Sequence, residues 1–92
     1  MSSLTLKIVT PEGVNRTIEC DSVTLWMAPD QKGRSEGSIG IRKGHTDAVI
    51  ALGNGPAQAR QGDKLMFSAK TSGGFATVVR DTVTIVSPHI EY

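Results

Sequence analysis

Apolar and polar residues alternate in short stretches along the chain, and residues that favour turns separate these stretches. In residues 4–10, for example, Leu4, Leu6 and Ile8 fall on one face of an extended strand. No segment keeps a helical period for ten residues. The pattern predicts an all-β fold of about eight to ten short strands, arranged as a two-sheet β-sandwich or flattened barrel. Further strands are expected within residues 14–20, 23–27, the glycine-rich stretch 35–45, and residues 46–52, 56–60, 64–69, 75–79 and 82–86.

Turn chemistry sets the limits of these strands. Residues 28–35 carry no periodic apolar residue and predict an exposed loop. A tight hairpin is expected at Ser72-Gly73-Gly74, and Ser87-Pro88 is expected to end regular structure. Other breaks are expected at Pro11-Glu12-Gly13, Asp21-Ser22, Gly53-Asn54-Gly55, Gln61-Gly62-Asp63 and Arg80-Asp81.

The same alternation assigns side chains to the core. Leu65, Phe67 and Ala69 are expected to point inward, and Phe75 is also expected in the core. Trp26 falls on the opposite face of its strand from Val23, Leu25 and Met27. An exposed Trp26 would mark a partner surface, whereas a buried one would be core.

A glycine-rich stretch over residues 35–45 is the most unusual part of the sequence. Ile39 and Ile41 lie two apart and share one face of a strand, while Gly40 leaves the opposite face nearly bare. Glycine is favoured where the backbone takes a positive φ or approaches another chain closely. We therefore expect other backbone to cover this face, or a partner to bind it.

Composition excludes several classes of protein. Ninety-two residues are enough for one domain with a modest core. Ten basic residues nearly balance nine acidic ones, which argues against nucleic-acid binding. A single cysteine, Cys20, excludes an internal disulfide, and neither a membrane-spanning apolar run nor a signal peptide is visible. The composition predicts a soluble protein of a reducing compartment.

Candidate chemistry is sparse. His45 and Asp47 share a strand face, an arrangement in which a carboxylate orients an imidazole, but no Gly-x-Ser-x-Gly nucleophile motif is present. The simpler interpretation is that His45 caps a turn. Cys20, His45 and His89 lack metal-ligand spacing, and the glycines lack the Gly-Lys-Ser/Thr of a phosphate loop. We therefore expect no catalytic residue, no metal and no cofactor.

Several segments, in this order and spacing, resemble the N-terminal β-sandwich domain of the epsilon subunit of F-type ATP synthases. They are residues 6–13, 23–25, 36–41 with Gly44-His45, 62–63, 72–76 and 83–86. The resemblance implies that residues 1–92 form one such domain. It also implies a non-catalytic rotor subunit that packs on the gamma subunit and on the c subunits of the membrane rotor ring. Such a subunit would be cytoplasmic and peripheral on the inner face of a bacterial cell membrane, without lipid insertion.

The resemblance further implies which residues face the rotor ring. They lie in and after the Glu-Gly-x-x-Gly-Ile stretch: Glu36, Ser38, Gly40, Ile41, Arg42, Gly44 and His45. Ser38 replaces a residue that is often acidic in the family. Lys43 stands where proline is usual, and Thr46-Asp47 replaces a common Ala-Pro. These changes are expected to loosen the turn.

Two alternatives remain open from the sequence. Family members usually continue into two C-terminal helices, so a chain that stops at Tyr92 would lack them, or would be a truncated or duplicate gene product. The second alternative is a free-standing β-sandwich that binds a small ligand or peptide. With few aromatic residues, only Trp26 and Tyr92 could provide a stacking surface for a sugar.

Overall fold

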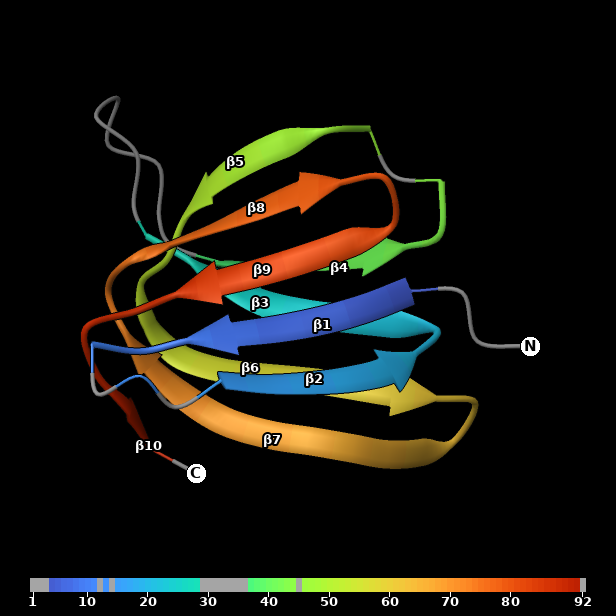
Figure 1. Ribbon diagram of the computed structural model, residues 1–92, viewed down its shortest axis with the longest axis horizontal. Coiled ribbons are helices and arrows are strands. Elements are labelled where there is room, and N and C mark those ends of the chain that lie inside the picture. The colour runs from blue at the N-terminus through green and yellow to red at the C-terminus, as the bar shows by residue number, and fades with distance from the viewer. Residues whose placement is uncertain (1–3, 12, 14, 29–36, 45, 92) are drawn as a thin grey trace.

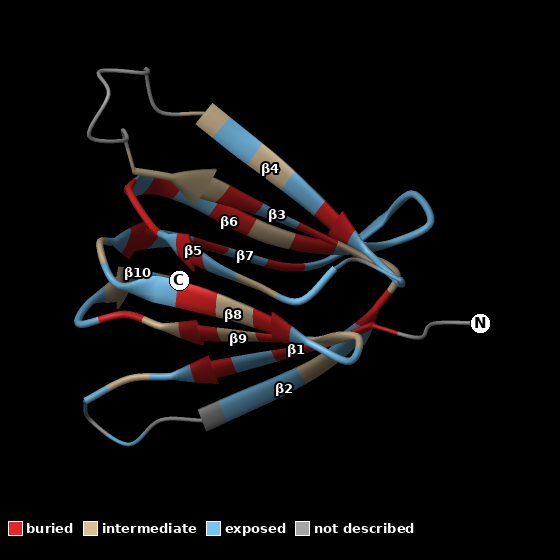
Figure 2. Cartoon of the chain, turned by 90° about the horizontal axis from the view of Figure 1, so that it is seen from above, coloured by how far each residue is buried: buried red, intermediate tan, exposed pale blue. Residues whose placement is uncertain are grey.

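Two five-stranded β-sheets face each other across the hydrophobic core (Figures 1 and 2). The computed structural model describes residues 4–11, 13, 15–28, 37–44 and 46–91. Within this part of the chain there is no helix, and hence none that is long and apolar enough to cross a membrane. The two-sheet sandwich confirms the predicted fold class. The strands are β1 (Leu4–Val9), β2 (Asn15–Cys20), β3 (Ser22–Met27), β4 (Gly37–Arg42), β5 (Ala48–Ala51), β6 (Asn54–Gln61), β7 (Lys64–Ser72), β8 (Phe75–Val79), β9 (Thr82–Val86) and β10 (Ile90–Glu91).

The order of strands is β2-β1-β9-β8-β5 in the first sheet and β10-β7-β6-β3-β4 in the second. Neighbouring strands are antiparallel except for β1 and β9, which pair in parallel. The chain changes sheet after β2, β4, β5, β7 and β9. β4 and β5 each lie at one edge of their sheets, opposite the edge strands β10 and β2.

Buried and exposed residues alternate along strands of both sheets, as the burial colours in Figure 2 show, and the buried side chains form one hydrophobic cluster. In the first sheet the fully buried residues include Leu4, Leu6 and Ile8 of β1, as the alternation predicted. The facing sheet contributes Leu25 and Ile41, both without exposed surface. Burial of such side chains is the main favourable contribution to the free energy of folding. The core therefore holds β4 in place through Ile41.

Two of the predicted turns connect consecutive strands that belong to different sheets, so they are crossovers between the sheets and not hairpins. Asn54 and Gly55 are the first residues of β6 and not the centre of a turn. Gly73 and Gly74 do have positive φ angles of 77° and 97°, but they link β7 to β8 in the opposite sheet, so no hairpin forms. Local turn chemistry marks a change of chain direction. It does not specify which sheet the next strand joins.

Two smaller boundaries also differ from the prediction. Ser22 is the first residue of β3, so the break before that strand falls at Asp21 alone. Regular structure continues past Pro88, because β10 pairs with β7 through Ile90 and Thr71. The turn at Arg80-Asp81 is confirmed, and both residues have left-handed φ angles, of 49° and 60°.

Two residues predicted to lie in the core are exposed. The pairing of β6 with β7 shifts by a residue between Ala59 and Arg60, so that Ala59 pairs with Phe67 and Arg60 pairs with Leu65. This β-bulge changes the direction of the side chains beyond it. Phe67 is buried but Leu65 is 45% exposed. Phe75 is 45% exposed as well, because it projects from the outer face of β8.

Trp26 is neither fully exposed nor fully buried. Its indole lies against Gly55, and its Nε1 is buried without a hydrogen-bond partner among the described residues. The contact with Gly55 and the buried Nε1 argue against Trp26 as an open stacking surface.

Candidate partner-binding surfaces

The edge strand β4 carries most of the residues that the family resemblance assigned to a partner surface. Among the described residues it pairs with β3 alone, so no described strand pairs with its other edge. The side chains of Ser38 and Arg42 are exposed on the outer face of the second sheet, together with Gly40. Ile41 has no exposed surface, so its side chain anchors the strand and does not itself reach a partner.

Gly40 leaves a bare area on this outer face. A Cβ atom added at Gly40 would meet no other atom within 4 Å. The β-ladder places Thr24 opposite Gly40, Gln58 opposite Thr24, and Ser68 opposite Gln58. The row is polar, uncharged and open enough for another backbone to approach closely.

Positive charge gathers at the end of β4. The ladder places Ser22 between Arg42 and Arg60, and both arginines are exposed. Lys43 follows Arg42 directly and is also exposed. Arg60 could not be assigned to this surface from the sequence, because it lies eighteen positions from Arg42 and only strand pairing brings the two together.

The predicted site is extended rather than compact. Ser38 lies near the start of β4, whereas Gly44 lies two residues beyond its end, in the connection to β5, with a φ of 84°. Glu36 and His45 lie outside the described residues, as do most of residues 28–35 and Tyr92. The structure therefore does not describe the proposed pairing of His45 with Asp47. The Asp47 carboxylate itself accepts a hydrogen bond from the backbone N–H of Arg80 at 3.3 Å.

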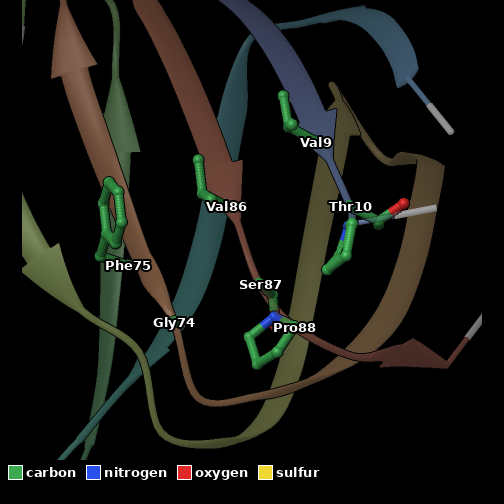
Figure 3. Close-up of a pocket in the computed structure, with 8 residues that line it drawn as sticks. Val9, Thr10, Gly74, Phe75, Val86, Ser87 and Pro88 are labelled. Atoms are coloured by element: carbon green, nitrogen blue, oxygen red, sulfur yellow. The ribbon is translucent and has the colours of Figure 1, made fainter. Parts of the chain in front are cut away.

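An apolar groove lies on the outer side of the first sheet (Figure 3). Phe75, Val86 and Val9 project on this side from three adjacent strands, because Phe75 pairs with Val86 and β9 pairs Val86 with Val9. Its volume is about 380 Å³. Exposed apolar areas of this kind are typical of protein contacts. The complete lining is Val9, Thr10, Pro11, Gly74, Phe75, Val86, Ser87 and Pro88.

Few polar groups could orient a small molecule in this groove. Ser87 is buried, and its hydroxyl contacts the carbonyl oxygens of Gly73 and His89 at 2.9 and 3.0 Å. Small-molecule sites combine apolar walls with a few directed polar groups. The groove therefore suits an apolar protein side chain better than a specific polar ligand.

Neither a metal site nor a reactive thiol is evident in the described part of the chain. No group of three His, Cys, Asp or Glu residues there is close enough to hold a metal ion. Cys20 is fully buried, and its thiol donates a long hydrogen bond to the carbonyl oxygen of Leu4 at 3.6 Å. Burial raises the pKa of the Cys20 thiol, and the nearby charges of Asp21 and Glu19 raise it further. A thiol held in its neutral form is a poor nucleophile.

Comparison with protein families matches nearly the whole chain to one domain. The family model described as the β-sandwich domain of the ATP synthase delta/epsilon chain matches residues 3–92.

Curated relatives point in the same direction. The ATP synthase epsilon chain of Leptospira borgpetersenii is 34% identical over 86 residues, which cover 94% of this chain and 61% of the relative. The epsilon chain of a Synechococcus strain is 29% identical and is matched over 56% of its length. This chain thus spans less than two thirds of each of these relatives.

Solved structures share the fold at low sequence identity. A chain in the central stalk and c-ring structure of Tetrahymena thermophila mitochondrial ATP synthase superposes with a TM-score of 0.67 at 15% identity, over 95% of this chain and 64% of that one. A chain in the Euglena gracilis mitochondrial ATP synthase structure gives a TM-score of 0.75 at 20% identity, over 98% of this chain and 53% of that one.

Proposed function

This chain belongs to the ATP synthase delta/epsilon chain family, and we propose that it is a non-catalytic subunit of the rotary central stalk. In this role it packs on the gamma subunit and on the c subunits of the membrane rotor ring, and it helps to couple ion translocation to ATP synthesis or hydrolysis. The family match over residues 3–92 is the observation that carries the proposal. Residues 1–92 would act as one domain, peripheral to the inner face of a bacterial cell membrane.

The architecture suits a part that transmits force. Two sheets packed on a continuous apolar core make a stiff body, because protein interiors are close-packed and hardly compressible. The parallel pairing of β1 with β9 joins the first strand to the last strand of the same sheet. A load applied at one end of the sandwich is therefore shared by strands from distant parts of the sequence.

The outer face of β4 and the connection that follows it are the surface that we assign to the rotor ring. Gly40 would admit close backbone contact there, while Arg42 would supply charge at the end of the strand. Ile41 contributes by anchoring the strand in the core. The full assigned set remains Glu36, Ser38, Gly40, Ile41, Arg42, Gly44 and His45.

A second candidate function is a free-standing sandwich that binds a small ligand or peptide. The groove beside Phe75 favours it, because about 380 Å³ is within the range of ligand pockets. The scarcity of directed polar groups in the groove argues against selective binding of a polar molecule.

Co-expression with the gamma subunit encoded in the same genome separates the two functions. Size-exclusion chromatography with light scattering should show a stable one-to-one complex of the two chains. If this chain elutes alone beside soluble, folded gamma subunit, the stalk function is wrong. Ligand screening against the groove would then be the next experiment.

A further inference from the structure

Two aspartates join the connection after β4 to the turn between β8 and β9. The backbone N–H of Gly44 donates a hydrogen bond of 2.8 Å to Oδ1 of Asp81. In return, Oδ1 of Asp47 accepts a hydrogen bond of 3.3 Å from the backbone N–H of Arg80. Each segment thus supplies a carboxylate to the other's backbone. We refer to Gly44, Asp47, Arg80 and Asp81 as the aspartate clasp.

The turn side of the clasp is firmly held. Asp81 has a φ of 60°, a left-handed conformation that aspartate tolerates better than most residues. Its backbone carbonyl accepts a hydrogen bond of 2.9 Å from the N–H of Thr5, near the start of β1. Asp81 therefore connects the β8–β9 turn both to β1 and to the connection after β4.

On the other side of the clasp, Gly44 has little packing of its own. Gly44 is exposed, and an added Cβ atom there would meet nothing within 4 Å, so packing does not hold it. The connection also crosses from the second sheet to the first, so no strand ladder holds it between β4 and β5. We expected this turn to be loosened because it lacks proline. The two carboxylates provide the restraint instead.

We propose that Asp81 and Asp47 are positioning residues, which hold the connection after β4 in the orientation that meets the rotor ring. This inference rests on the proposed stalk function. Through the clasp, a displacement of Arg42 and Lys43 by a partner is passed directly to the first sheet. Charge-assisted bonds to backbone N–H groups are among the stronger hydrogen bonds in proteins, which makes them suited to this task.

Substitution of Asp81 tests the clasp without disturbing the turn. Asp81→Gly removes the carboxylate but keeps a residue that adopts a positive φ freely. Asp81→Asn is the matched control, because its amide oxygen can still accept the bond and asparagine tolerates the same φ. Amide hydrogen exchange of Gly44, followed by NMR on the folded chain, should accelerate about tenfold in Asp81→Gly and stay near wild type in Asp81→Asn. Unchanged exchange of Gly44 in Asp81→Gly would overturn the inference.

The role in coupling needs the assembled enzyme. Complexes that carry Asp81→Gly should hydrolyse ATP while pumping several-fold fewer ions per ATP, and Asp81→Asn should restore the ratio. Normal assembly with an unchanged pumping ratio in Asp81→Gly would overturn this inference alone. A wild-type chain that does not assemble with the gamma subunit would overturn the stalk function, and the positioning role with it.

Discussion

Gly55, near the start of β6, lies so close to the indole of Trp26 that no side chain fits between them. A Cβ atom at Gly55 would stand 2.7 Å from Cδ1 and 2.8 Å from Cβ of Trp26, and closer still to Cγ. These atoms belong to the base of the tryptophan side chain, which cannot swing away without a rotamer change. The contact fixes the start of β6 against the end of β3.

Gly55→Ala should therefore destabilise the fold. Overpacking at a closed contact typically lowers the free energy of unfolding by about 1–3 kcal/mol. Urea denaturation followed by Trp26 fluorescence measures the change. A stability equal to wild type would show that the indole moves aside at no cost.

Gly40→Ala is the matched control and should have the opposite effect. The space beside Gly40 is open, and replacing glycine inside a strand recovers roughly 0.5–1 kcal/mol of backbone entropy. A loss of stability in Gly40→Ala would contradict the open geometry.

A larger side chain at Gly40 tests the partner surface. Gly40→Gln should leave the isolated chain folded, because nothing lies within 4 Å of the added atom, but should block close backbone approach to the outer face of β4. The assembled ATP synthase should then retain several-fold less of the variant chain than of Gly40→Ala during purification. Equal retention of the two variants would remove this face from the interface.

The buried thiol of Cys20 predicts a loss of stability at alkaline pH. Because the pKa is raised in the folded state, the thiol ionises first in the unfolded chain as the pH rises above the ordinary value of 9.0. The contribution of Cys20 is thus fully present below that pH and falls above it. The free energy of unfolding of wild type, minus that of Cys20→Ala, should decrease as the pH rises above about 9. Parallel pH profiles for the two proteins would contradict the assignment.

Local sequence patterns predicted buried residues and turns correctly wherever apolar alternation or turn residues alone determine the local structure. Alternation grouped Leu4, Leu6 and Ile8 on one strand face, which the structure buries, and turn chemistry located Arg80-Asp81. Ile41, which was assigned to the partner surface, is buried instead. Alternation failed at Leu65, where a β-bulge between Ala59 and Arg60 changes the direction of the side chains. Sequence alternation cannot reveal a bulge, because the extra residue becomes apparent only when the strand meets its neighbour.

The candidate site was only partly predictable, because some of its contacts join residues that are far apart in the sequence. Gly40 could be assigned to an open strand face from neighbouring residues alone, whereas Arg42 was assigned through the family resemblance. The hydrogen bond between Gly44 and Asp81 joins positions 37 residues apart, and no local pattern signals it. Phe75 shows the same limit, since an apolar residue in a strand is expected inside unless the outer face is known to be uncovered.

Photo-crosslinking in the assembled ATP synthase tests the stalk assignment most directly. A photoreactive amino acid at Arg42 would probe the exposed end of β4, and the same group at Thr17, exposed on β2 of the opposite sheet, is the control. The stalk assignment predicts covalent products with the c subunit from position 42 and none with it from position 17. Two results would contradict the stalk assignment. One is crosslinking to the c subunit from position 17 but not from position 42, and the other is no crosslink to any ATP synthase subunit from either position.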